Sequence, residues 1–335
     1  MKRTIISLIL LFSFLNIYSN PNKGNNTANN IVENQYDKLV NLAKTYFDKN
    51  TEYAFNCAYK AHSIAEENKD SQMCPVYSEE EARELAYWIV EYTTGMTRTE
   101  ILFSNQKKEI PNLTTILDQL RKYTPIQYIF GHTDWMGLRL KVTPATLIPR
   151  PETAELVEWI LSTCDNNAPL AITDIGTGSG CIAIALKKKC PIWHVQGIDI
   201  SADALKVASE NAAHNGVEVE WIQADILAPT SNNLFSNTDI TVSNPPYICN
   251  REKVDMDARV LDYEPHTALF VPDDNPLLFY RRIASMKAAK SLYFEINEAY
   301  GQEVCDMLKE LGYTDIQLKN DIYGKARMVF GRIEK

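Results

Sequence analysis

The chain lacks the cysteine and histidine patterns that accompany metal sites and disulfide frameworks. Its seven cysteines are scattered without a Cys-x-x-Cys pair, and its five histidines show no spacing typical of a zinc site. We therefore expect no metal ion in the functional site. An odd number of scattered thiols fits a reducing compartment better than a set of disulfides.

The chain also lacks an excess of positive charge. Its formal net charge is −9 over 335 residues, whereas nonspecific binding to nucleic acid needs a basic surface. A local basic patch is compatible with that total, but we expect no direct requirement for nucleic acid. The hydrophobic fraction of 45% and the charged fraction of 23% are ordinary for a globular protein, and the length allows two domains or one large domain with an appendage.

A hydrophobic run of membrane-spanning length is missing at the start of the chain. The stretch from Thr4 to Tyr18 is mostly apolar, follows Lys2-Arg3, and is too short to span a bilayer. A basic start, a short apolar stretch and polar sequence after Ser19 resemble a secretory signal, and the alternative is a buried N-terminal helix. We expect no membrane partner for the main domain of the chain.

Composition and periodicity divide the chain into segments. Residues 20–30 are polar and rich in asparagine, which is typical of a linker, and residues 36–69 predict a helical hairpin of unclear role. Periodic apolar residues after Ser78 predict short helices, and alternation over residues 135–142 predicts a β-hairpin. The predicted segments are 1–19 (signal-like), 20–77 (linker and helical hairpin), 78–130 (helical cap that binds substrate), 131–150 (hairpin arm and linker) and 151–335 (main domain).

From Ala171 onward strand and helix patterns alternate, which is typical of a doubly wound α/β sheet. The first strand runs into the cluster Gly176-Thr177-Gly178-Ser179-Gly180, which Asp174 precedes. Glycines between a strand and a helix let the backbone approach a ligand closely and turn its amides toward it. The Gly-x-Gly-x-Gly spacing differs from the Gly-x-Gly-x-x-Gly of dinucleotide folds, which favours a cofactor without a pyrophosphate.

Acidic residues follow the next two predicted strands. Asp199 ends the second strand, where an acidic group holds ribose hydroxyls in folds of this kind. Asp225, with Ile226 beside it, ends the third strand and is placed to accept a hydrogen bond from an adenine amino group. The alternative for each aspartate is a helix cap. Features at successive strand ends together predict S-adenosylmethionine as the ligand.

The motif Asn244-Pro245-Pro246-Tyr247 follows the apolar, β-branched strand Asp239 to Ser243. Proline cannot donate to a sheet ladder, so the strand stops there and leaves Asn244 at the carboxyl edge, where ligands bind in open α/β sheets. The amide, the fixed proline carbonyls and the aromatic ring predict a receptor for a small planar group that carries N–H donors. The alternative is a strand-ending turn without a ligand.

Together these residues resemble one known family. From Ser78 to the C-terminus the chain is similar to the bacterial protein-(glutamine-N5) methyltransferases that modify peptide-chain release factors. The Asn-Pro-Pro-Tyr motif is shared with DNA adenine-N6 methyltransferases, whereas its combination with Ile148 to Thr153 is specific to the glutamine enzymes. The segments that carry the resemblance are Pro125 to Gly131, Leu147 to Thr153, Asp174 to Gly180, Asn244 to Ile248, Glu264-Pro265, Ala268-Leu269, Phe294 to Ile296 and Arg327.

The resemblance implies a class I S-adenosylmethionine-dependent methyltransferase sheet with a small N-terminal helical domain and an N-terminal extension foreign to the family. It implies that Gly176 to Gly180, Asp199, Asp225, Ile226 and Asn244 hold the cofactor. It further implies that Asn244, Pro245, Pro246 and Tyr247 bind the glutamine of the Gly-Gly-Gln motif in class 1 release factors and orient it for methyl transfer.

Other functions are compatible with the same motifs. They are methylation of a ribosomal-protein glutamine, methylation of adenine-N6 or guanine-N2 in nucleic acid, and a binding role for a degenerate methyltransferase. Because the cofactor and the release factors are cytosolic, we expect a cytoplasmic function despite the signal-like start.

The chain departs from the family pattern at several positions. Ala154 stands where members usually carry an acidic residue, directly after Thr153, which we expect to cap the helix 154–163. The turn from Lys287 to Ser291 lacks the usual glycine-rich loop, so we expect a shortened preceding helix or a distorted following strand. The family's first helix is replaced by residues 1–77, which we expect to be dispensable for the chemistry.

Overall fold

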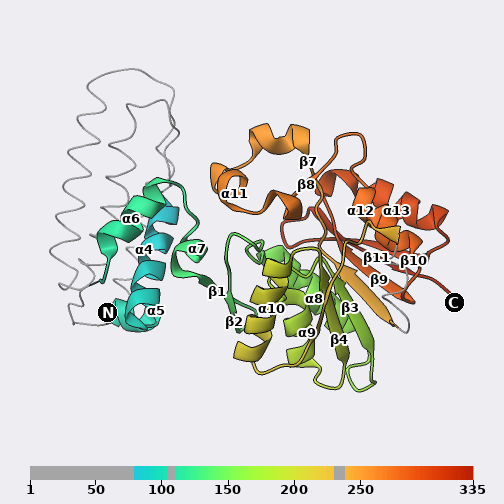
Figure 1. Cartoon of the computed structure of the whole chain (residues 1–335), viewed down its shortest axis with the longest axis horizontal. Coiled ribbons are helices and arrows are strands. Elements are labelled where there is room, and N and C mark those ends of the chain that lie inside the picture. The colour runs from blue at the N-terminus through green and yellow to red at the C-terminus, as the bar shows by residue number, and fades with distance from the viewer. Residues whose placement is uncertain (1–78, 104–109, 230–237, 335) are drawn as a thin grey trace, which may run out of the picture. The chain divides into compact units, whose positions relative to one another are not determined.

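The structure is a computed structural model that describes residues 79–103, 110–229 and 238–334 (Figure 1). The chain divides into a first unit, Met1–Pro111, and a second unit, Asn112–Lys335, and this boundary falls inside the predicted segment 78–130. The predicted signal, linker and helical hairpin within residues 1–77 lie outside the described residues. Among the helices of the described ranges, none combines the length and hydropathy that crossing a bilayer requires.

In the first unit, the structure describes α4 (Glu79–Thr94) and α5 (Arg98–Phe103). Ala86, Ile89 and Val90 are buried on one face of α4, at the spacing of an amphipathic helix. Gly95 follows α4 with a φ of +71°, the left-handed conformation that commonly ends helices. Gly95 therefore ends α4.

The second unit begins with two short helices and a hairpin. They are α6 (Leu113–Arg121), α7 (Ile126–Phe130), β1 (His132–Trp135) and β2 (Leu138–Lys141). Met136 and Gly137 join the strands with φ values of +51° and +76°, because a tight two-residue hairpin turn requires positive φ. Leu138 and Leu140 are buried while their neighbours in β2 are exposed. The predicted hairpin is confirmed, and it begins earlier than expected, at His132.

A seven-stranded sheet forms the centre of the second unit. Its strands are β3 (Ala171–Ile175), β4 (His194–Asp199), β5 (Glu220–Gln223), β6 (Ile240–Ser243), β9 (Ser291–Glu295), β10 (Thr314–Asn320) and β11 (Ala326–Arg332). The order is β10-β11-β9-β6-β3-β4-β5, with β9 to β5 parallel and β11 and β10 joined antiparallel at one edge. The predicted doubly wound sheet is confirmed, and its chain order reverses between β3 and β6.

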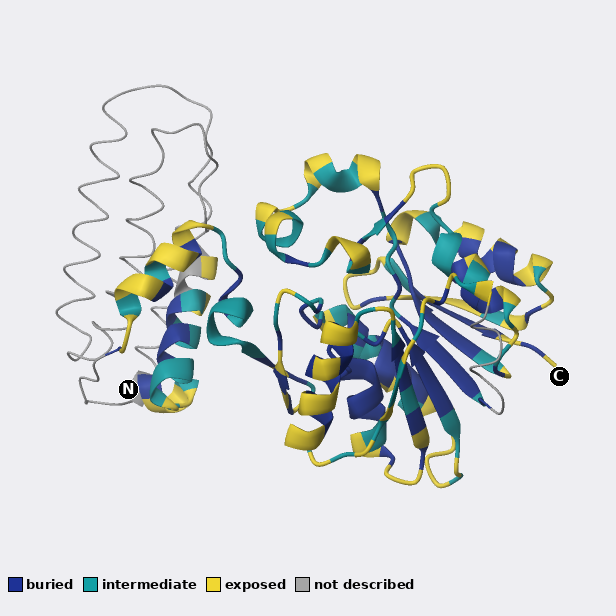
Figure 2. Cartoon of the chain, in the orientation of Figure 1, coloured by how far each residue is buried: buried dark blue, intermediate teal, exposed yellow. Residues whose placement is uncertain are grey.

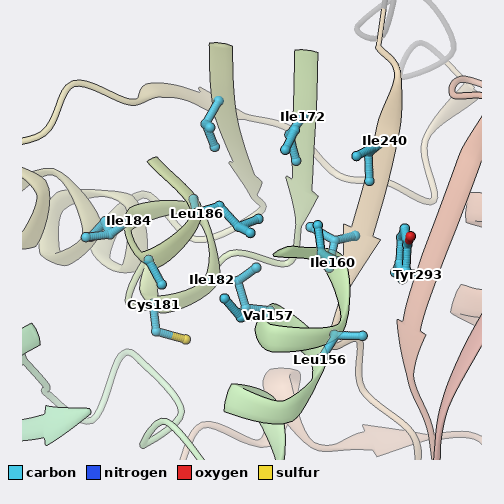
Figure 3. Close-up of a cluster of buried hydrophobic side chains, with 14 of the residues drawn as sticks. Leu156, Val157, Ile160, Ile172, Cys181, Ile182, Ile184, Leu186, Ile240 and Tyr293 are labelled. Atoms are coloured by element: carbon cyan, nitrogen blue, oxygen red, sulfur yellow. The ribbon is translucent and has the colours of Figure 1, made fainter. Parts of the chain in front are cut away.

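Helices pack on both faces of this sheet (Figure 1). They are α8 (Pro151–Thr163), α9 (Cys181–Lys189), α10 (Ala202–His214), α12 (Leu278–Ser285) and α13 (Gly301–Glu310). Successive strand residues point to opposite faces, so Tyr293 joins the buried cluster under α8 and α9 while Phe294 joins the cluster under α12 and α13. Figure 2 shows the strands buried between exposed helix faces. Figure 3 shows side chains of the cluster under α8 and α9, among them Ile160 of α8, Ile182 of α9 and Ile172 of β3.

Short elements connect the end of β6 to α12 and the end of β9 to α13. They are β7 (Ile248–Cys249), η2 (Asn250–Asp255), α11 (Ala258–Tyr263), η3 (His266–Ala268), β8 (Phe270–Val271) and η4 (Glu298–Tyr300). The strands β7 and β8 pair in parallel, with Ile248 opposite Phe270. The loop after Asn244 is therefore held by a small sheet of its own.

The prediction that Thr153 caps a helix is wrong. Helix α8 begins at Pro151, with Arg150 in an extended conformation at its N-cap. Proline is favoured at the first helical position because its fixed φ suits the helix and its missing N–H would have no partner there. Thr153 therefore lies inside the helix, and its hydroxyl is available for a different contact.

The turn before β9 leaves the strand intact. Helix α12 ends at Ser285. Lys287 then adopts a left-handed φ of +49°. Strand β9 keeps an unbroken parallel register with β6, from Ile240 opposite Ser291 to Ser243 opposite Phe294. Of the two expected consequences of this turn, the distorted strand is not observed.

Candidate active site

The predicted site residues follow strands that end at the same edge of the sheet. Ile175 at the end of β3 is in register with Ile198 of β4 and with Ser243 of β6. Asp199 at the end of β4 is in register with Gln223 of β5. The glycine loop after β3 and the Asn-Pro-Pro-Tyr motif after β6 thus meet where the chain order reverses, the position at which open α/β sheets bind ligands.

The glycine loop keeps its backbone uncovered at two positions. Gly176 and Gly178 have φ values of +71° and +56°, and a Cβ built on either would have no atom within 4 Å. The Gly176 amide donates to the Ile198 carbonyl at 2.8 Å, which holds the loop onto β4. The loop therefore presents main chain to open space, as close approach of a ligand requires.

Gly180 has a different environment although it belongs to the same spacing pattern. A Cβ on Gly180 would lie 2.9 Å from the Trp221 ring and 3.1 Å from Ala208 Cβ. Gly197 of β4 faces the same ring, and a Cβ there would overlap Trp221. These two glycines make room for a tryptophan on β5, so the structure gives Gly180 a packing reason in addition to the proposed cofactor contact.

Buried polar contacts stabilise the glycine loop on its core side. Asp174 is fully buried, and its Oδ2 accepts a hydrogen bond from the Thr177 hydroxyl at 2.6 Å. Burial raises the pKa of Asp174 to about 7. Ser179 is also buried, and its carbonyl accepts from Asn211 Nδ2 of α10 at 2.9 Å. The side chains of Asp174 and Thr177 therefore lie under the loop and stabilise its conformation, and the Ser179 backbone is anchored to α10.

Asp199 bridges the glycine loop and the start of α10. Its Oδ2 accepts from the Gly178 amide and its Oδ1 from the Ser201 amide, both at 2.9 Å. Burial raises the pKa of this carboxyl group despite those two amide donors. Each carboxylate oxygen has a second lone pair, so the group can still accept hydrogen bonds from a ligand's hydroxyls.

Asp225 and Ile226 follow β5 and lie in a turn. The Asp225 Oδ1 accepts from the Leu227 amide at 2.9 Å, and the side chain is exposed. Ile226 is buried, and its carbonyl accepts from Arg282 Nε at 2.8 Å. The Asp225 carboxylate therefore caps a backbone amide within a turn, whereas the predicted alternative was a helix cap.

Asn244 lies at the end of β6 and is half-buried. Its Nδ2 donates to Thr153 Oγ1 at 3.3 Å, and Thr153 Oγ1 donates to Glu295 Oε2 at 2.6 Å. The Tyr247 hydroxyl donates to the other oxygen of the same carboxylate, Glu295 Oε1, at 3.3 Å. We call Asn244, Thr153, Glu295 and Tyr247 the hydrogen-bond chain, which connects the motif to the core.

The rest of the motif is fixed by backbone contacts. Pro245 is buried and Pro246 is half-buried. The Tyr247 amide donates to the Leu269 carbonyl at 3.2 Å, and the Tyr247 carbonyl accepts from Asn297 Nδ2 at 3.2 Å. The motif is therefore held from both sides, by the loop before β8 and by the residues after β9.

An ion pair joins two further motif segments that are distant in sequence. Arg150 Nη2 lies 2.6 Å from Glu264 Oε1, and the Glu264 side chain is only 2% exposed. The amide of Ile148 donates to the other oxygen of Glu264 at 3.4 Å. Burial raises the pKa of Glu264, although Arg150 acts in the opposite direction. This pair fixes the extended segment that leads into α8 and hence Thr153.

We expect Arg150→Ala to lower the free energy of unfolding by about 3 kcal/mol, because it leaves a buried carboxylate without its guanidinium. Urea denaturation followed by tryptophan fluorescence measures the change. The matched control is Arg139→Ala, since Arg139 and its partner Asp134 have side chains that are 54% and 55% exposed. That exposed pair contributes less than about 1 kcal/mol. Equal losses in the two variants would contradict the role of burial.

Several proteins of known family are similar to this chain in sequence. The family described as "Methyltransferase small domain" matches residues 156–262. The release factor glutamine methyltransferase of Flavobacterium psychrophilum is 42% identical over 269 residues, which cover 77% of this chain and 94% of that protein. The protein of the same name from Bacteroides thetaiotaomicron is 43% identical over 239 residues, which cover 70% of this chain and 84% of that protein. The chain belongs to the release factor glutamine methyltransferase family.

As a member of this family, the chain is an S-adenosylmethionine-dependent methyltransferase. The residues at the sheet edge fit that cofactor. Gly176 and Gly178 leave open space where a side chain would otherwise stand, and Asp199 offers acceptor lone pairs beside them. We propose that these residues, with Asp225 and Ile226, hold the cofactor, which supplies an activated methyl group when bound. Among the described residues no group of His, Cys, Asp or Glu is arranged to hold a metal ion, and the described cysteines are unbridged.

Two polar residues of the methyltransferase site had no functional role in the sequence prediction. The sequence predicts only a helix cap for Thr153, and it places Glu295 only within the matching segment Phe294 to Ile296. A signal for Glu295 is present in the sequence, because a carboxylate within the apolar strand Leu292 to Ile296 must be paired or protonated when buried. Local sequence does not reveal which residue is its partner.

Proposed function

We propose that this chain transfers the methyl group of S-adenosylmethionine to the side-chain amide nitrogen, N5, of the glutamine in the Gly-Gly-Gln motif of class 1 peptide-chain release factors. The observation that carries the proposal is the position of Asn244 at the end of β6, beside the open glycine loop after β3. The names of the relatives support the choice of substrate.

The chemistry asks the protein to position its substrate. An amide nitrogen is a poor nucleophile because its lone pair is delocalised into the carbonyl, whereas the methyl donor is already activated. Asn244 Oδ1 and the Pro245 carbonyl accept the two N–H bonds of the glutamine amide, which aims the nitrogen lone pair at the methyl group. Tyr247 packs against the amide plane. The proton leaves after transfer, once the nitrogen has become acidic, so no general base is assigned.

The release factor is the proposed partner, and both it and the cofactor occur in the cytoplasm, where we place the reaction. The flanking glycines of Gly-Gly-Gln let the substrate backbone enter a narrow site. Segments 78–130 and 131–150 are proposed to contact the rest of the folded factor. Methylation of the whole factor is therefore expected to be faster than methylation of a short Gly-Gly-Gln peptide.

Mass spectrometry of a class 1 release factor incubated with the full-length chain and isotope-labelled cofactor tests the proposal. We expect one labelled methyl group on the motif glutamine. The matched control is the same factor with glutamate in place of that glutamine, which should stay unlabelled because a carboxylate has no N–H for Asn244 and Pro245 to accept. Faster labelling of a ribosomal protein or of duplex DNA would overturn the substrate assignment.

A further inference from the structure

Glu295 is a buried carboxylate that the proposed methyl transfer does not itself require. It is 1% exposed at the end of β9 and accepts from Thr153 Oγ1 at 2.6 Å and from Tyr247 at 3.3 Å. Thr153 is 2% exposed and comes from α8, on a separate element. A buried carboxylate that binds two hydroxyls beneath a substrate motif calls for an explanation, since burial of such a group is costly.

The Thr153 hydroxyl has a single proton, so it can donate a hydrogen bond to only one partner at a time. An ionised carboxylate only accepts, so the 2.6 Å contact with Glu295 takes the hydroxyl proton. The remaining capacity of Thr153 Oγ1 is then to accept, and a partner at that oxygen must donate. Asn244 can donate only through Nδ2, which lies 3.3 Å away. Its Oδ1 must consequently point away from Thr153.

We propose that Thr153 and Glu295 are positioning residues that hold the Asn244 carboxamide with its oxygen toward the substrate, and that they thereby set the preference for a primary amide over a carboxylate. The inference rests on the proposed function. An asparagine carboxamide has an acceptor end and a donor end of nearly equal shape, so its position alone selects neither substrate. The orientation decides, because Oδ1 attracts an amide N–H and repels a carboxylate oxygen.

The orientation of the Asn244 carboxamide also depends on whether Glu295 is ionised. Burial raises the pKa of Glu295 to about 7. A protonated carboxyl group can donate to Thr153 Oγ1, which frees the Thr153 proton to turn toward Asn244 and favours the reversed carboxamide. The orientation is therefore stable above about pH 7 and is lost as the pH falls through that value.

Other titratable groups act on Glu295 from the elements around it. They are Glu152 of α8, Cys181 of α9, Tyr247 after β6, Tyr280 of α12 and Arg327 of β11. Arg327 favours the ionised form of Glu295, and Glu152 opposes it. The tyrosines and the cysteine have pKa values raised by burial, so they stay neutral through this range. Burial also raises the pKa of Asp174, under the glycine loop, to about 7, so the pH dependence is measured at saturating cofactor.

Thr153→Val tests the inference in the full-length chain. Valine keeps the shape of threonine and removes the hydroxyl, so Asn244 is free to turn its Nδ2 toward the substrate. At saturating cofactor, we expect kcat on the release factor to fall about tenfold, the effect of one orienting hydrogen bond. The release factor with glutamate in place of the motif glutamine acts as a competitive inhibitor. We expect the ratio of its inhibition constant to the KM of the native factor to fall about tenfold in this variant. In the unmodified chain kcat should fall below about pH 7, as Glu295 becomes protonated. In Thr153→Val this fall should be absent.

Two further variants separate orientation from packing. Thr153→Ser keeps the hydroxyl and should restore both the rate and the discrimination. Thr163→Val makes the same change in the same helix, where the hydroxyl donates to the Trp159 carbonyl at 2.8 Å, and should change neither. Unchanged discrimination in Thr153→Val, or an equal change in Thr163→Val, would overturn the inference while leaving the proposed function intact. A wild-type chain that leaves the release factor unmethylated would overturn the proposed function, and the inference with it.

Discussion

Replacing Gly178 with valine should abolish binding of S-adenosylmethionine while the sheet stays folded. Gly178 has a φ of +56°, and a Cβ at this position would project into open space with no atom within 4 Å. A branched side chain there would occupy the volume that we assign to the cofactor. The left-handed backbone adds strain of about 1–2 kcal/mol for any L-residue. Calorimetric titration with the cofactor should show no binding, and circular dichroism should show a folded protein.

The strain of Gly178→Val has a matched control in Gly216→Val. Gly216 follows α10 with a φ of +66°, and it also has no atom within 4 Å of a built Cβ. The control therefore carries the same backbone cost without a side chain at the sheet edge. It should lose similar stability and keep normal cofactor affinity. Normal affinity in Gly178→Val would show that the cofactor does not contact this loop.

Replacing Asn244 with alanine should lower the rate of release factor methylation by about 10²–10³ at saturating cofactor. An orienting hydrogen bond at a reacting group typically contributes that much, as the donors of oxyanion holes show. Cofactor affinity should change far less, because the glycine loop and Asp199 remain in place. Single-turnover kinetics and calorimetry on the same preparations measure the two effects separately.

Asn250→Ala is the control for this substitution. Asn250 follows the same loop, and its Nδ2 donates to the Val271 carbonyl at 3.1 Å, away from the glycine loop. It should leave the single-turnover rate close to that of the unmodified chain. If Asn244→Ala instead loses cofactor affinity and rate in equal proportion, Asn244 serves the cofactor and not the glutamine.

The sheet edge was predictable from the sequence because its signals are local. Proline stops a strand wherever it stands, and glycine permits the left-handed turn of the loop after β3. These signals therefore place Asn244 and the glycine cluster at strand ends without reference to distant neighbours. The alternating pattern then predicts that parallel strands bring those ends together, as the observed registers do.

The contacts that hold the site in place were not predictable in the same way. Thr153 and Glu295 are 142 residues apart, and Arg150 and Glu264 are 114 apart, so no local pattern connects them. Thr153 follows a proline-rich stretch at the start of a helix, which is also the sequence pattern of a cap. The Gly-x-Gly-x-Gly pattern likewise does not distinguish Gly178 from Gly180. In the structure Gly178 faces open space and Gly180 faces Trp221.

The packing of Trp221 against Gly197 of β4 couples the substitutions that evolution can accept at these two positions. Gly197 and Trp221 are paired across neighbouring strands, and a methyl group at position 197 would overlap the tryptophan ring. A lineage that acquires alanine at 197 first would pass through an overpacked intermediate, and one that first acquires a smaller residue at 221 would pass through an intermediate with a cavity. Natural sequences should therefore show a larger residue at position 197 only together with a reduced side chain at position 221.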